Sequence, residues 1–162
     1  MSQQFSVSIE GAKQGPFKSE SQTREDRQAA IRGIKFLLES VSPRDVATGQ
    51  ASGKRQHKPI SFTKEWGAAS PQLWTALATN EVLKQVVFEF TKPNGDGRET
   101  VFHTVTLTNA SVASIRSYVD QTDTSGDPFD GHALEDVTLT YQTIAMESRE
   151  GKTASKDDWI VH

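Results

Sequence analysis

Histidine is the residue type in this sequence best suited to metal binding or proton transfer, because its ring titrates near neutral pH. The chain has four histidines, His57, His103, His132 and His162, and no cysteine. No two histidines have the spacing of metal ligands, and the lack of cysteine removes thiolate zinc sites, iron–sulfur clusters and cysteine nucleophiles. His103 has apolar neighbours at Val101 and Val105, which favours a hydrogen-bonded structural role. These residues predict no catalytic or metal centre, and no cofactor.

Two further segments match ligand-binding loops only in part. Gly151-Lys152-Thr153 looks like the end of a phosphate-binding loop, but the earlier glycine that such a loop requires would fall on Met146. The acidic segment 123–135 would need glycine at Pro128 and an acid at Leu134 to be a calcium loop. We interpret both as solvated turns or loops, with a weak calcium site as the less favoured reading of the second. No Gly-x-Ser-x-Gly elbow is present, and the residue spacing shows no other catalytic constellation.

The stretch Lys54-Arg55-Gln56-His57-Lys58 is the only dense basic segment. It is either a solvated loop or a contact to an acidic neighbour. It lacks the interleaved aromatic residues on which bases stack, and the net charge of -3 gives no basic excess. We therefore expect no nucleic-acid partner.

Length and composition indicate one domain, spanning residues 1–162. A chain of 162 residues suits a single core, and a hydrophobic fraction of 35% indicates a polar but folded protein. No apolar run approaches the roughly 20 residues of a membrane-spanning helix, so we expect no membrane insertion. The N-terminal residues show no cationic and apolar pattern of a cleaved signal peptide.

Alternation of apolar and polar residues predicts a mainly β fold. It marks several segments, with Thr and Val abundant: 5–10, 34–39, 86–91, 101–108, 112–119 and 137–146. Lys92-Pro93-Asn94-Gly95-Asp96-Gly97 joins two of them and predicts an antiparallel hairpin, because Asn-Gly and Asp-Gly steps supply the positive φ of tight turns. Seven to nine strands would form a barrel or a sandwich.

One short helix is predicted after Ser70-Pro71, read as an N-cap followed by proline at the first helical position. Leu73, Trp74, Leu77 and Ala78 would form its apolar face, and Asn80 would end it. The segments 40–59 and 120–131 read as long loops, which are uncommon in compact domains unless they have a function.

The segment 42–60, SPRDVATGQASGKRQHKPI, resembles the extended loop of the haemolysin-coregulated protein (Hcp) family. The following SFTKEWGAASPQL, residues 61–73, is similar to that family's strand and single helix, and the C-terminal portion, residues 134–159, is similar as well. The resemblance covers essentially the whole chain, and residues 42–73 are its most specific part.

This resemblance implies a fold, an assembly and a set of partners. The fold would be a small barrel of two antiparallel sheets with one helix, assembling into a hexameric ring. Rings would stack into the tube of the bacterial type VI secretion system, with the tip protein, the sheath and effector proteins as partners. The protein would lie in the bacterial cytoplasm before assembly and then be secreted without a cleaved signal peptide. The chain stops without the C-terminal toxin domain that some members carry, which predicts a carrier and not an enzyme.

The resemblance also suggests two groups of functional residues. The 42–59 loop would contact another subunit or the next ring, and its charged or titratable residues would set the register: Arg44, Asp45, Lys54, Arg55 and His57. The strand near residues 31–40 would border the channel, with Ile34, Phe36 and Leu38 facing the core. Lys35, Leu37 and Glu39 would then point the other way, into the lumen, as candidate effector contacts.

Two other interpretations remain open at this point. A tail-tube protein of a related phage-like contractile system would share the ring and the channel but would pass DNA. An enzyme or ligand-binding barrel would be a monomer or dimer with an internal pocket.

Overall fold

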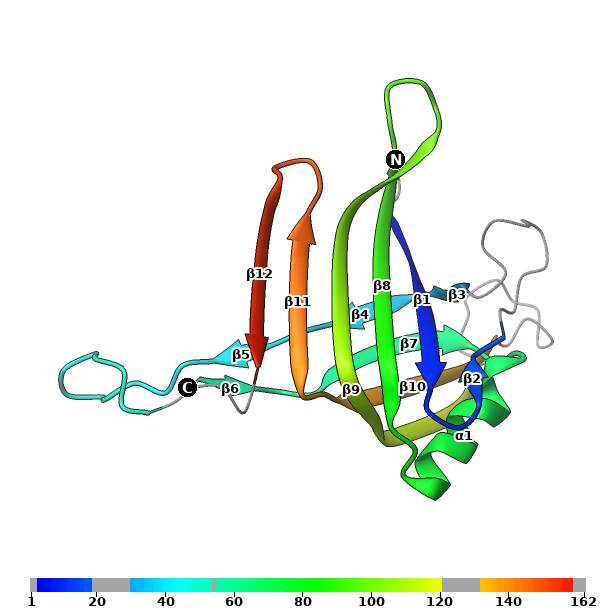
Figure 1. Cartoon of the computed structure of the whole chain (residues 1–162), viewed down its shortest axis with the longest axis horizontal. Helices are drawn as coiled ribbons and strands as arrows, with labels where there is room; N and C mark the ends of the chain where they lie inside the picture. The colour runs from blue at the N-terminus through cyan, green and yellow to red at the C-terminus, as the bar shows by residue number, and fades with distance from the viewer. Residues whose placement is uncertain (1–2, 19–29, 54, 121–131, 159–162) are drawn as a thin grey trace.

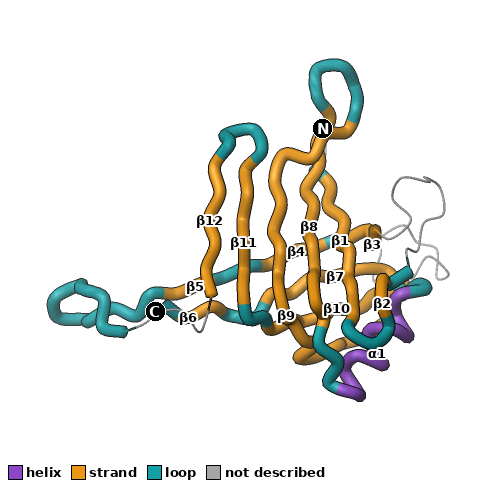
Figure 2. The backbone as a smooth tube through the Cα atoms, in the orientation of Figure 1, coloured by secondary structure: helices purple, strands orange, loops and turns teal. Residues whose placement is uncertain are grey.

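A computed structural model describes residues 3–18, 30–53, 55–120 and 132–158. These residues form twelve strands and one helix (Figures 1 and 2). In chain order the elements are β1 (Gln4–Gly11), β2 (Gly15–Pro16), β3 (Ala30–Gly33), β4 (Lys35–Leu37), β5 (Ser40–Val41), β6 (Gln56–His57), β7 (Ile60–Glu65), α1 (Ala69–Thr79), β8 (Leu83–Pro93), β9 (Glu99–Asp120), β10 (His132–Thr140), β11 (Thr143–Ser148) and β12 (Thr153–Asp158). The predicted mainly β fold with one short helix is confirmed.

The strand β9 connects the two layers of the fold. It is 22 residues long; its first half pairs with β8 and β11, and its second half pairs with β10. Between the halves lies Asn109, whose φ of 51° is left-handed, a conformation that Asn tolerates better than most residues. Figure 1 shows the strand bending, so that β8 and β11 run across the direction of β7 and β10. The predicted strands 101–108 and 112–119 are thus one bent strand.

Two antiparallel sheets result, as predicted. The first contains β1, β2, β3, β8, the first half of β9, β11 and β12; the second contains β4, β7, β10 and the second half of β9. The chain also crosses between the two sheets from β3 to β4. β3 pairs with β1 of the first sheet, and β4 pairs with β7 of the second. The ladder is interrupted at Ile34, so the expected barrel is not closed by continuous hydrogen bonding.

This crossing corrects one prediction about the strand near residue 34. Phe36 and Leu38 pack against the core as expected, but the Ile34 side chain is 54% exposed. Because the chain passes from one sheet to the other at Ile34, the alternation of buried and exposed side chains is broken there. The fully buried isoleucine is Ile31 of β3. The predicted run 137–146 is likewise two strands, β10 and β11, separated at Tyr141–Gln142.

The predicted hairpin at residues 92–97 is confirmed. β8 and β9 pair antiparallel on either side of it, with Pro93 opposite Glu99. The Asn94 N–H donates to the Arg98 carbonyl over 2.8 Å, and Gly97 has the positive φ, 78°, that the turn requires.

The helix α1 packs against one end of the two sheets through Ala69, Leu73 and Ala76. It begins earlier than predicted, with Ala68 as its N-cap, and it ends at Asn80 as predicted, in a left-handed conformation with φ 52°. Because of this shift Pro71 is not the first helical residue. The buried face of the helix also differs from the predicted one, so that Trp74 and Ala78 are exposed.

A buried ion pair joins β7 to β10 beneath the start of α1. Lys64 Nζ lies 2.6 Å from Glu135 Oε1, and the two side chains are 0% and 1% exposed. Ser70 of α1 donates to the same Glu135 oxygen over 2.7 Å and accepts a hydrogen bond from the Gly67 N–H. Ser70 is therefore the second residue of the helix and not the predicted N-cap. Its hydroxyl connects the buried ion pair to Gly67, just before the helix.

Replacing Lys64 with methionine should destabilise the protein by about 3–5 kcal/mol, because it leaves the Glu135 carboxylate buried without its cation. Lys58→Met is the matched control: Lys58 pairs with Glu39 at 3.1 Å, but both side chains are 52% exposed. That variant should cost less than about 1 kcal/mol. Denaturant unfolding of both variants measures the difference. Equal, small losses would contradict a structural role for the buried pair.

Candidate functional site

Residues 40–53 and 55–57 extend away from the two sheets as an arm (Figure 1). Its root is the small antiparallel sheet of β5 and β6, in which Ser40 pairs with His57 and Val41 with Gln56. We call residues 42–53, beyond this root, the extended loop. Within it Arg44 pairs with Ala51 in an isolated bridge, and the Ser52 N–H donates to the Pro43 carbonyl over 2.9 Å. The loop is therefore a hydrogen-bonded hairpin, not an irregular coil.

A compact turn forms the tip of the extended loop. The Asp45 N–H donates to the Gln50 carbonyl over 2.7 Å, and the Asp45 carboxylate accepts from the Ala47 N–H over 2.8 Å. Gly49 has a positive φ of 73°, which favours glycine at that position. Val46 at the tip is fully exposed, with a relative accessibility of 103%. Asp45, predicted as a contact residue, thus also stabilises the turn that presents Val46.

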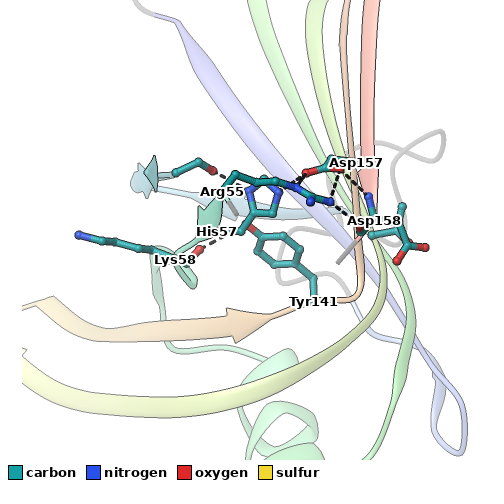
Figure 3. A network of polar contacts seen from close by, with 8 residues as sticks. Arg55, His57, Lys58, Tyr141, Asp157 and Asp158 are labelled. Carbon is teal, nitrogen blue, oxygen red and sulfur yellow. Dashed lines mark hydrogen bonds and ion pairs between the residues drawn. The ribbon is translucent and has the colours of Figure 1, made fainter. Parts of the chain in front are cut away.

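A charged cluster fastens the root of the arm to β12 (Figure 3). Arg55 makes a bidentate contact with Asp157, through Nε to Oδ2 at 2.6 Å and Nη2 to Oδ1 at 2.7 Å. Arg55 Nη2 also donates to the Asp158 carbonyl over 2.6 Å. Bidentate arginine–carboxylate contacts fix direction as well as distance. We call this contact between Arg55 and Asp157 the clamp.

His57 extends the clamp across the root. Its Nε2 lies 2.5 Å from Asp157 Oδ2, and its Nδ1 lies 2.8 Å from the Ser40 hydroxyl on the paired strand. Next to it, the Tyr141 hydroxyl donates to the Lys58 carbonyl over 3.3 Å. The root is thus held by β12 and by the connection between β10 and β11.

The clamp changes the pKa of its members. Hydrogen bonds from Arg55, then from His57, hold the pKa of Asp157 well below its usual range, and the same contact raises the pKa of Arg55. Burial, followed by the charge of Asp157, raises the pKa of Tyr141. Because the folded pKa of Asp157 is below the unfolded one, its stabilisation is fully present above about pH 4 and is lost only as the pH falls through the lower folded value.

Ser40, His57 and Asp157 are also the residue types of a hydrolase triad. Here Arg55 contacts both oxygens of the carboxylate, so Asp157 is engaged by the arginine as well as by the histidine. Ser40 is at the same time a paired residue of the root. We interpret Ser40, His57 and Asp157 as a structural hydrogen-bonded group that holds the root of the arm.

The predicted lumen residues are only partly brought together. Lys35 and Leu37 line a concavity of about 300 Å³ on the outer face of the second sheet, and the exposed Ile34 lines it too. Asp136 on its wall accepts hydrogen bonds from Thr63 at 2.6 Å and from the Tyr118 hydroxyl at 3.3 Å. Glu39 does not line this concavity; its carboxylate accepts from Lys58 Nζ over 3.1 Å.

Comparison with known proteins identifies the family. The sequence profile of the family described as "Type VI secretion system effector, Hcp" matches residues 7–147. A curated relative from Pseudomonas aeruginosa, named "Major exported protein", is 32% identical, with 94% of this chain and 93% of the relative covered. The chain belongs to the Hcp family.

Solved Hcp structures have the same fold. A crystal structure titled "Crystal structure of Hcp protein" matches with a TM-score of 0.87 at 25% identity and covers 99% of this chain and 100% of its own. The structure of Hcp1 from E. coli EAEC 042 matches with a TM-score of 0.83 at 25% sequence identity. The match covers 96% of this chain and 98% of that one. The structure of the secreted protein Hcp3 from Pseudomonas aeruginosa matches with a TM-score of 0.76 at 26% sequence identity. The match covers 96% of this chain and 99% of that one.

The clamp gives two of the predicted loop residues of this Hcp chain an internal role. Arg55 and His57 contact β12 of their own chain, whereas Arg44 and Asp45 lie on the extended loop; Lys54 lies outside the described residues. Asp157 was not among the predicted site residues, because it lies 102 residues from Arg55 and no local pattern links the two.

The structure adds two findings about other classes of site. In the described ranges, no three His, Asp or Glu residues gather as metal ligands. No helix in the described part is long and apolar enough to cross a membrane. Gly151-Lys152-Thr153 lies at the turn between β11 and β12, as the sequence predicted, while the segment 121–131 of the acidic loop lies outside the described residues.

Replacing Asp157 with asparagine should free the root of the arm, because an amide cannot give Arg55 a charged, bidentate partner. Trypsin should then cleave after Arg44 or Arg55 about three to ten times faster, since cleavage follows the population of locally opened states. Glu39→Gln is the matched control, because it removes only the exposed pair with Lys58 and should change the rate less than twofold. Equal cleavage of Asp157→Asn and the wild type would show that the clamp does not hold the arm.

Proposed function

We propose that this Hcp chain is a tube subunit that closes into six-membered rings, and that these rings stack into a tube carrying effector proteins. The family match over residues 7–147 carries this proposal. The proposed partners are further copies of the chain, the type VI tip protein, the sheath and effectors. The proposed route runs from the bacterial cytoplasm into the secreted tube. The same family match favours a secretion tube over a phage tail tube.

The arm supports assembly through contacts between copies. It extends beyond the compact body, it is hydrogen-bonded along its length, and the clamp fixes its root. A preordered arm loses little conformational freedom on binding, which reduces the cost of association. A ring also needs two different surfaces on each subunit that complement one another. The extended loop, with Arg44 and Asp45, is our candidate for one of these surfaces.

The concavity on the second sheet is our candidate for the channel wall. Lys35 provides a cation there, and the half-exposed side chains of Ile34 and Leu37 provide apolar surface. Such a mixture of charge and apolar area suits weak, reversible contacts with folded cargo. The effector contacts proposed for this chain are therefore Lys35 and Leu37, with Ile34 as an addition from the structure; Glu39 lies outside this wall.

Electron microscopy of the purified chain over a range of concentrations tests the proposal. We expect rings with a central channel, which become more frequent as the concentration rises. Monomers at all concentrations would contradict the assembly and the channel together.

Labelling of the rings tests the channel wall separately, using the absence of native cysteine. In Lys35→Cys rings, a small maleimide should react freely, whereas a maleimide attached to a globular protein should be excluded from the channel. Lys84→Cys, at an exposed position of β8 on the first sheet, is the matched control and should accept both reagents. Equal reaction of both variants with the bulky reagent would place Lys35 outside the channel.

A further inference from the structure

An apolar groove lies beside α1, on the body of the protein. Trp66, Pro71 and Trp74 line it, with Ser117 of β9 and Glu135 of β10, and its volume is about 540 Å³. The two tryptophans are 49% and 47% exposed. Trp66 is held in place, since its indole N–H donates to the Leu134 carbonyl over 2.8 Å. The groove is therefore a rigid aromatic surface that folding leaves uncovered.

A buried carboxylate oxygen lies under the groove. Glu135 is 1% exposed, and its Oε1 contacts Lys64 and Ser70. Its Oε2 is buried and has no hydrogen-bond partner among the described residues. A buried acceptor left unpaired costs about 1–3 kcal/mol, and such atoms in native proteins call for a specific explanation. A donor that arrives with a binding partner would supply the missing hydrogen bond.

The combination of tryptophan faces and a carboxylate selects the chemistry of that partner. Aromatic faces attract cations, most strongly those of tryptophan. A guanidinium stacks flat on an aromatic ring and can donate several hydrogen bonds at its edge to a carboxylate. An arginine side chain fits both features of the groove at once.

The chain itself carries an arginine in a suitable position. Arg44 is exposed on the extended loop, and its guanidinium has no partner among the described residues, whereas Arg55 is engaged in the clamp and Arg116 lies over Tyr118. Val46, two residues along, is fully exposed and offers apolar surface for the tryptophans. The extended loop and α1 lie toward opposite ends of the longest axis of the molecule (Figure 1), so one copy cannot fill its own groove.

We infer that the extended loop of one copy docks into the Trp66–Trp74 groove of a second copy, with Arg44 between the rings and directed at Glu135. This inference rests on the proposed assembly and names the surface that receives the arm. The contact joins two different patches, so it is heterologous and can repeat from copy to copy around a ring or along a tube. Because Lys64 already pairs with the charge of Glu135, the guanidinium would contribute the hydrogen-bond donor that Oε2 lacks.

Cross-linking tests the contact, because the chain contains no cysteine. Val46→Cys is combined with Ala78→Cys, which lies one helical turn beyond Trp74 and leaves both tryptophans intact. Treated with a short bismaleimide, this double variant should give a ladder of covalent oligomers on a denaturing gel. Val46→Cys with Gln85→Cys, an exposed position on β8, is the matched control and should give no ladder.

A double-mutant cycle provides a second readout. Arg44→Ala and Trp74→Ala should each raise the concentration needed for assembly about tenfold, and the double variant should raise it no further, because both remove one contact. Arg98→Ala, on the other projecting hairpin, should combine additively with Trp74→Ala. Rings that form without the ladder, or additive effects of Arg44 and Trp74, would overturn the inference while leaving the proposed function intact. Failure of the wild type to form rings would overturn both.

Discussion

The strand β9 runs without a break through both sheets and holds them together. One half of this strand pairs with β8 and β11 and the other half with β10, so a single backbone fixes both layers relative to one another. Phe88, Val105 and Leu107 of the first sheet therefore meet Phe62 and Val137 of the second in one buried core. A left-handed Asn109 makes the bend between the halves. The outer faces of these sheets, the end near α1 and the projecting arm remain accessible outside this core.

The arm is independent of that core and needs its own fastening. β5 and β6 form a separate sheet of two strands, and a two-stranded hairpin alone is only marginally stable. Arg55 and His57 compensate for this by contacting Asp157 on β12, which the first sheet holds through β11. The depressed pKa of Asp157 keeps this fastening charged at any pH near neutrality or moderately below it. The arm is thus fastened by a charged cluster, at a place where the hydrophobic core does not hold it.

Alternation and turn chemistry were enough to predict the mainly β fold, the hairpin at Asn94-Gly95 and the end of the helix at Asn80, because these features depend on local sequence. Predictions failed where tertiary structure overrides local pattern. Ile34 is exposed because the chain changes sheets there. Trp74 is exposed because α1, which begins two residues earlier than predicted, packs through Ala69, Leu73 and Ala76. The partner of Arg55 could not be predicted, since Asp157 becomes its neighbour only through the pairing of β11 with β12. The resemblance of residues 42–73 pointed to the right family but gave Arg55 and His57 no internal partner.

We propose that the arm, fixed at its root by the clamp, enables this Hcp chain to assemble. Sedimentation of a charge exchange is the decisive experiment, with Arg55→Glu, Asp157→Arg and the two changes combined. Each single variant should sediment mainly as monomer, because its root carries two like charges, and the combined variant should regain most of the ring population. Rings in both single variants, or no recovery in the combined one, would contradict it.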